Sequence, residues 1–297
     1  MQDYETAYEL ENGLRGVLAP NPSPLTFRGT NTYILGASSV VVVDPGPDID
    51  SHLDAILGAI RGAKLEAILV THSHLDHSPL CAKLKAQTGA PVLGYGPSDA
   101  GQSDQMAELA KSGDVGGGEG IDEGFKPDIT LSDGETIDVE GAELQALWTP
   151  GHLSNHLSFA LGDAVLTGDH VMGWATSLIS PPDGDLTAFM NSCRKLEARQ
   201  DRVYYPGHGD PVTDPAERIA WLIDHRLGRE AQILHALDRP GTAAEITGWV
   251  YTDIEPYLLP AAERNVLAHL IDLVERGIVF TDGPLSLTSK FHLNPER

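Results

Sequence analysis

The chain has 297 residues, of which 41% are apolar, and this is enough to build the core of one large domain with a smaller one beside it. Its 43 acidic residues outnumber 20 lysines and arginines and give a formal charge of -23, which disfavours binding to the phosphates of nucleic acids. The sequence lacks a signal-peptide pattern and the roughly 20 apolar residues of a membrane span, so we expect a cytoplasmic protein without membrane contacts.

The predicted elements are those of an α/β fold. Apolar runs predict strands at residues 32–35, 40–43, 65–70, 91–93, 136–139 and 144–147. Apolar residues at helical spacing predict helices at residues 51–61, 79–88, 185–198, 214–237, 242–251 and 261–276. We expect Ser78 to cap the second of these helices and His52 to face solvent from the first. Cys81 and Cys193 lie in predicted helices and are expected to be free, buried thiols.

Residues 71–77, Thr-His-Ser-His-Leu-Asp-His, place three imidazoles and a carboxylate on a loop that leaves a buried strand. His72 and His74 alternate along this loop, so their side chains face the same way and suit one metal ion. Asp76 and His77 lie past the bend and suit a second ion nearby. Imidazole and carboxylate ligands favour zinc, iron or manganese. We therefore interpret this loop as a metal site rather than as a polar surface loop rich in histidine.

Three further motifs follow strand-like segments: Pro150-Gly151-His152, Thr167-Gly168-Asp169 and Tyr-Pro-Gly-His-Gly at residues 205–209. Together with the histidine loop, and in this order, they resemble the metallo-β-lactamase superfamily from about residue 30 to residue 211. The resemblance implies an αββα sandwich. It also implies that the first metal binds His72, His74 and His152, that the second binds Asp76, His77 and His208, and that Asp169 bridges the two. Asp169 in place of a cysteine resembles the hydroxyacyl-glutathione hydrolase and nuclease branches.

Several other residues are candidates for supporting roles. Asp44 lies in a Val-Asp-Pro-Gly segment, where the resemblance implies that it braces the metal loops, although it could be an ordinary turn residue. Asp76 and His156 are the candidate catalytic side chains. His156 could donate a hydrogen bond to a substrate oxygen, shuttle a proton, or orient its loop. Met172 and Trp174, in an apolar loop after the bridging position, are expected to line the substrate pocket, with Trp174 either stacking on substrate or packing in the core.

Residues 99–124 are rich in acids and contain Gly116-Gly117-Gly118. A glycine-rich phosphate cradle would follow a strand and open a helix with a lysine, and this stretch does neither. We therefore expect a mobile excursion and a candidate lid.

The C-terminal part is expected to start at residue 213, after a catalytic domain at residues 1–212. Its predicted helices and a hairpin at residues 278–280 and 285–287 resemble a winged helix. This order of parts resembles the β-lactamase-like protein 2 group of endoribonucleases. The presumptive recognition helix carries Glu263, Asp272 and Glu275 against Arg264 and Arg276, so we expect no DNA binding, but a packing or dimerisation module that shapes the active-site mouth. A homodimer is a candidate assembly.

These expectations converge on a binuclear metal-dependent hydrolase. Two divalent ions, with zinc as the default, would hold a bridging hydroxide that attacks an ester, thioester, lactone or amide of a small molecule. One alternative is a metal-dependent endoribonuclease, favoured by the full-length resemblance and opposed by the negative charge. The other is a non-catalytic winged-helix regulator with a structural metal, although seven matched ligands exceed what a structural zinc needs.

Overall fold

The computed structural model describes residues 3–11, 13–118 and 120–295. Its centre is a pair of stacked sheets. The larger sheet has the strand order β1-β2-β3-β4-β5-β6-β7 and the smaller β12-β11-β10-β9-β8. The strands of the larger sheet are β1 Tyr8–Glu11, β2 Leu14–Leu18, β3 Asn31–Gly36, β4 Ser39–Val43, β5 Lys64–Leu69, β6 Val92–Gly94 and β7 Ile129–Thr130. Those of the smaller sheet are β8 Thr136–Val139, β9 Ala142–Trp148, β10 Leu157–Leu161, β11 Ala164–Gly168 and β12 Val203–Pro206.

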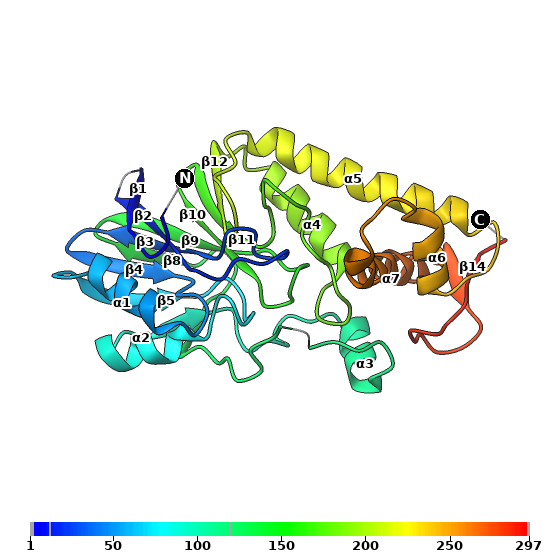
Figure 1. The fold of residues 1–297 in the computed structure, drawn as a ribbon, viewed down its shortest axis with the longest axis horizontal. Helices are drawn as coiled ribbons and strands as arrows, with labels where there is room; N and C mark the ends of the chain where they lie inside the picture. The colour runs from blue at the N-terminus through cyan, green and yellow to red at the C-terminus, as the bar shows by residue number, and fades with distance from the viewer. Residues whose placement is uncertain (1–2, 12, 119, 296–297) are drawn as a thin grey trace.

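Helices cover both outer faces of this sandwich (Figure 1). The helices α1 Asp50–Ala59 and α2 Leu80–Thr88 pack on the larger sheet, and α4 Leu186–Glu197 and the start of α5 Pro215–Ala236 pack on the smaller one. Strand β4 shows why its apolar run is unbroken: Val41 and Val43 face the other sheet, whereas Val40 and Val42 face the helices. The αββα sandwich expected from the sequence is confirmed.

The C-terminal part forms a second apolar cluster joined to the sandwich by α5. Its other elements are α6 Ala243–Val250, the short 3-10 helix η1 Pro256–Leu258, α7 Leu259–Glu275, β13 Val279–Thr281 and β14 Phe291–Leu293. The helix predicted at residues 242–251 begins with a capping box, in which Thr242 and Glu245 bond reciprocally. The hairpin prediction is wrong in its second strand, since β13 pairs with β14 and not with residues 285–287.

The segment at residues 99–124, expected to be a mobile excursion, contains a helix, α3 Asp104–Ser112, that was not predicted. Its apolar side chains, Met106 and Leu109, are buried together with Val115 in the C-terminal cluster. In Figure 1, α3 accordingly lies beside α7, far from α1 and α2. The prediction failed because these side chains pack against partners that lie more than a hundred positions later in the chain. Within the described residues, no helix is long and apolar enough to cross a bilayer.

Candidate metal centre

Four loops meet at one edge of the two sheets. They follow β5, β9, β11 and β12 and carry, in chain order, His72, His74, Asp76, His77, His152, Asp169 and His208. The structure brings these seven side chains into two adjoining groups. The ligand atoms of His72, His74, His152 and Asp169 all lie within 4.8 Å of one another, and so do those of the other three. Their role as metal ligands remains a prediction, and their geometry can now be tested against it.

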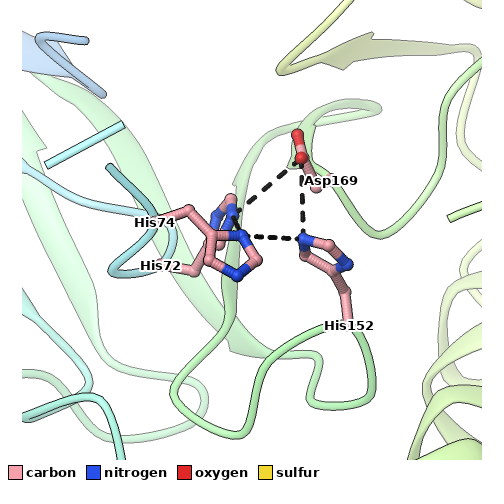
Figure 2. Close-up of side chains that lie close together, drawn as sticks. All are labelled: His72, His74, His152 and Asp169. Carbon is pink, nitrogen blue, oxygen red and sulfur yellow. Dashed lines mark hydrogen bonds and ion pairs between the residues drawn. The ribbon is translucent and has the colours of Figure 1, made fainter. Parts of the chain in front are cut away.

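The first group is compact, and its side chains point toward one another (Figure 2). Nδ1 of His74 lies 3.0 Å from Nε2 of His72 and 3.0 Å from Nε2 of His152. Oδ2 of Asp169 lies 3.6 Å from Nε2 of His152 and 3.9 Å from Nε2 of His72. Three imidazole nitrogens and one carboxylate oxygen therefore lie together, and this donor set suits a divalent ion such as zinc, iron or manganese.

The second group, Asp76, His77 and His208, lies against Asp169 of the first. Oδ2 of Asp169 lies 3.3 Å from Nε2 of His208, and its Oδ1 lies 3.4 Å from Nε2 of His77. Oδ2 of Asp76 lies 3.1 Å from Nε2 of His208 and 3.4 Å from Nε2 of His77. The Asp169 carboxylate thus reaches both groups, which is the position that the resemblance assigns to a bridging ligand.

Two buried atoms of this centre agree with a bound cation. Nε2 of His77 and Oδ1 of Asp169 are buried, lie 3.4 Å from each other, and have no hydrogen-bond partner among the described residues. Buried polar atoms are normally satisfied, so such orphans point to a missing partner. Both atoms face the centre, and both belong to ligand types that bind zinc, iron or manganese.

The electrostatics differ between the two groups. Burial lowers the pKa of His74 to about 3 and holds the pKa of His72 well below its usual value, so both imidazoles are neutral at pH 7. Burial also opposes charge on His208, but the Asp169 carboxylate outweighs it and raises the pKa of His208 to about 9. The Asp76 and Asp169 carboxylates likewise overcome burial and raise the pKa of His77 well above its usual value. A cation in the second group must therefore displace protons.

The ligand imidazoles are held by protein partners on their other ring nitrogen. Nδ1 of His152 lies 2.7 Å from the carbonyl oxygen of Leu178, and Nδ1 of His208 lies 3.1 Å from that of Gly29. Nδ1 of His77 lies 2.9 Å from Oδ2 of Asp44. Such contacts fix the tautomer and aim the opposite nitrogen at the metal.

Asp44 has the surroundings of a bracing residue. It is 2% exposed, and its carboxylate accepts hydrogen bonds of 2.7 Å from both the backbone N–H and the hydroxyl of Thr71, besides its contact with His77. Its φ of 51° lies in the left-handed region, which Asp tolerates better than most residues. One side chain thus joins the end of β4 to both ends of the histidine loop.

His156 is buried beneath the centre rather than exposed to a substrate. It is 0% exposed; its Nδ1 lies 3.0 Å from Oγ1 of Thr149, and its Nε2 accepts a hydrogen bond of 3.2 Å from the backbone N–H of Asp169. A Cβ on Gly168 would lie 2.7 Å from this Nε2, which explains the glycine before Asp169. Of the roles that the sequence left open, this geometry favours orientation of a loop over contact with substrate.

The two residues predicted to line the substrate pocket, Met172 and Trp174, differ in their exposure to solvent. Met172 is buried at 5% exposure, whereas Trp174 remains 36% exposed and stacks on Phe27 with ring centroids 5.0 Å apart. A Cβ on Gly209 would lie 2.7 Å from the Trp174 ring, so this ring packs on the residue after His208. Sequence reasoning missed Phe27, because a single aromatic residue outside every predicted element has no pattern that marks it.

Two other residues near the centre also had unexpected roles. Ser78 was expected to cap α2, but its side chain makes no capping hydrogen bond. Its hydroxyl instead donates to Oδ2 of Asp122 at 2.7 Å and so ties the residue after the histidine loop to Asp122. The hydroxyl of Thr30, the residue before β3, donates to Oδ2 of Asp76 at 3.3 Å. Cys81 and Cys193 are free and buried, as expected.

Comparisons with known proteins show what this chain is similar to. The family model of the metallo-beta-lactamase superfamily matches residues 25–208, and that of the beta-lactamase associated winged helix domain matches residues 242–284. A beta-lactamase-like protein 2 homolog from Drosophila melanogaster is 32% identical over 88% of this chain and 87% of its own length. An atrochrysone carboxyl ACP thioesterase from Aspergillus fumigatus is 32% identical over 74% of this chain and 64% of its own. A metallo-beta-lactamase family protein from Thermus thermophilus superposes with a TM-score of 0.76 at 27% identity, covering 95% of this chain and 99% of that one.

Proposed function

The chain belongs to the metallo-beta-lactamase superfamily and is a metal-dependent hydrolase, and from this premise we propose that it uses two ions, of zinc by default, to cleave an ester or thioester of a small molecule with an apolar part. Lactones and amides are further members of the same substrate class. The observation that carries the proposal is a pair of exposed aromatic rings at the edge of the centre, described next.

The aromatic pair would give a substrate an apolar surface beside the ions. Phe27 and Trp174 are 44% and 36% exposed and lie nearly parallel, at an interplanar angle of 18°. Leu75, between two predicted ligands, is 52% exposed. Large apolar side chains that stay in solvent beside a polar centre are typical of a binding site. An acyl chain or aromatic ring packed on them would place its carbonyl group near the donor atoms.

The chain's own residues would hold the reacting groups. Bound divalent ions would supply Lewis-acid polarisation and a water whose pKa is lowered toward neutrality. His74, Asp76 and His152 keep intermediate exposure, whereas the other four donors are buried, so a substrate would approach from the side of these three. His156 holds the backbone at Asp169, and Thr30 donates to Asp76. Zinc is proposed because imidazole and carboxylate donors suit it, and iron or manganese would suit the same donors.

A metal-dependent endoribonuclease is the second candidate, favoured by the relatives that match nearly the whole chain. Two observations oppose it. The formal charge is -23, and α7, the helix that would read a nucleic acid in a winged helix, is buried along its length at Ala262, Val266, Leu267, Ala268, His269, Leu270, Ile271 and Leu273. A helix buried in this way cannot enter a groove. The same burial opposes a DNA partner and a regulator that reads DNA, and it supports α7 as a packing element.

Substrate class can be tested directly with zinc-loaded protein. We expect hydrolysis of butyryl and benzoyl thioesters of N-acetylcysteamine and of p-nitrophenyl butyrate, followed by thiol or nitrophenol release. A fluorescently labelled single-stranded RNA should stay intact at the same enzyme concentration. Cleavage of the RNA without turnover of any acyl substrate would overturn the proposal in favour of the endoribonuclease.

The aromatic pair supplies the variant for this test. Phe27→Ala removes the ring that stacks on Trp174, and we expect kcat/KM for the benzoyl thioester to fall roughly tenfold, which is about 1.4 kcal/mol of lost contact. Hydrolysis of the acetyl thioester should change much less, since it has little apolar surface to lose. Phe280→Ala is the matched control, because Phe280 is 42% exposed but belongs to β13 of the C-terminal part. Equal losses with both acyl groups would contradict a binding role for Phe27.

A further inference from the structure

We propose that Arg264 of α7 is a positioning residue through which the C-terminal part of the chain sets the geometry of the first metal group. The inference rests on the metal centre of the proposed function. It concerns two segments that flank the centre: the glycine strap (residues 113–118 and 120–122) and the proline loop (residues 177–182). Both are held by this one guanidinium.

Arg264 reaches three acceptors with three different nitrogens. Its Nε donates to Oγ of Ser180 at 2.8 Å, and its Nη2 donates to the carbonyl oxygen of Pro181, both in the proline loop. Its Nη1 donates to the carbonyl oxygen of Val115 in the glycine strap at 2.5 Å. A planar guanidinium carries five N–H donors on three nitrogens and can reach all three acceptors. The single ammonium nitrogen of a lysine cannot.

The proline loop carries this restraint to two predicted ligands. The carbonyl oxygen of Leu178 lies 2.7 Å from Nδ1 of His152, so the position of the loop decides where the opposite nitrogen of that imidazole points. The hydroxyl of Ser177 donates to the backbone oxygen of Asp169 at 2.5 Å. Asn265, the neighbour of Arg264 on α7, accepts a hydrogen bond of 3.3 Å from the backbone N–H of Ile179.

The glycine strap carries the restraint to a third ligand. It pairs with the histidine loop on both sides of His74: the N–H of Leu75 donates to the oxygen of Gly120 at 2.8 Å, and the N–H of Asp122 donates to the oxygen of Ser73 at 2.8 Å. His74 itself forms an isolated β-bridge with Ile121. The strap therefore fixes the backbone on which this imidazole is mounted.

Arg264 thus contacts both segments, the proline loop that reaches His152 and the glycine strap that reaches His74. His74 and His152 both belong to the first group, and their nitrogens lie 3.0 Å apart. Release of the strap and the loop would let these two imidazoles move independently. The second group would be affected less, because His77 is held by Asp44 and His208 by Gly29, neither of which touches these segments, and the loop reaches this group only through Asp169. The expected signature is a selective loss at one of two ion sites.

The experiment is a stepwise titration of metal-free protein with zinc in competition with a chromophoric chelator. For Arg264→Ala we expect roughly 10–100-fold weaker affinity at one site, the range found when a residue that orients a ligand is removed, and a clearly smaller loss at the other. The absorption bands of the cobalt-loaded variant should change shape, since they report ligand geometry. Arg264→Lys should lose nearly as much, because it keeps the charge but not the three-point contact. It also carries the test if Arg264→Ala does not fold.

Arg229→Ala is the matched control. Arg229 is a partly buried arginine of α5 whose guanidinium lies 3.8 Å from the ring centroid of Tyr251 and whose Nη1 donates to Gln232, both in the C-terminal part. It should lose stability without a change in zinc affinity or in the cobalt spectrum. Wild-type affinity at both sites in Arg264→Ala, or an equal loss in Arg229→Ala, would overturn the inference. Because the readout is ion affinity, a wild-type chain that binds two ions but turns over no acyl substrate would contradict the proposed substrate alone.

Discussion

Asp169→Ala is expected to abolish hydrolysis and to cost the protein at least one of its two ions. Its carboxylate oxygens lie within 3.6 Å of ring nitrogens of His77, His152 and His208, so this side chain contacts both groups. Its negative charge also offsets repulsion between two cations. We expect kcat/KM to fall by roughly 10³ or more, equivalent to about 4 kcal/mol of transition-state stabilisation.

Two variants make that result interpretable. Asp169→Asn keeps the shape of the side chain and the backbone N–H that donates to His156, and should lose nearly as much activity because it loses the charge. Asp163→Ala removes an exposed carboxylate near the start of the same strand and should behave as wild type. Activity within tenfold of wild type in Asp169→Ala, measured with its metal content, would be incompatible with a bridging role.

Removal of metal should lower both activity and thermal stability. A ligand that binds only the folded chain adds roughly 4 kcal/mol when its free concentration is about 1,000 times its dissociation constant. At roughly 2–4 °C per kcal/mol, we expect the melting temperature to fall by about 10 °C after dialysis against a chelator. Added zinc should restore both properties. Asp169→Ala is the control, and its melting temperature should respond less to the chelator.

The same shift should depend on pH. The pKa of His208 is raised to about 9 and that of His77 lies well above its usual value, so both are protonated at neutral pH unless a cation replaces the protons. Ion affinity should therefore weaken as the pH falls below about 9, and the stabilisation by zinc should shrink with it. A zinc-dependent shift in melting temperature that is the same at pH 6 and pH 8.5 would contradict this linkage.

The core of the site could be predicted from local sequence because its chemistry is concentrated in short motifs. The run from Ala67 to Val70 marks a strand buried on both faces, and the histidines that follow it need only the end of that strand to place them. The starts of α5 and α6 are also encoded locally. Each helix begins at a capping residue, Asp214 or Thr242, whose partner lies only three positions later in the chain.

Features that depend on distant partners escaped the sequence analysis. His52 was expected to face solvent, yet it is 0% exposed, and its Nε2 lies 2.9 Å from Oγ1 of Thr32 on a neighbouring strand. The strands β1 and β2 were not predicted, because they are short and their pairing is decided by the sheet they join. Arg264 was counted only as a charge on a helix face. Its contacts with Val115 and Pro181 could not be foreseen from residues so far apart in the chain.

The most direct measurement is a crystal structure of the zinc-loaded chain with anomalous scattering recorded on both sides of the zinc absorption edge. We expect two peaks, one among His72, His74 and His152 and one among Asp76, His77 and His208, with the Asp169 carboxylate in contact with both. An empty site, or a single peak with His152 or His208 turned away from it, would contradict the two-ion centre on which the proposed hydrolysis depends.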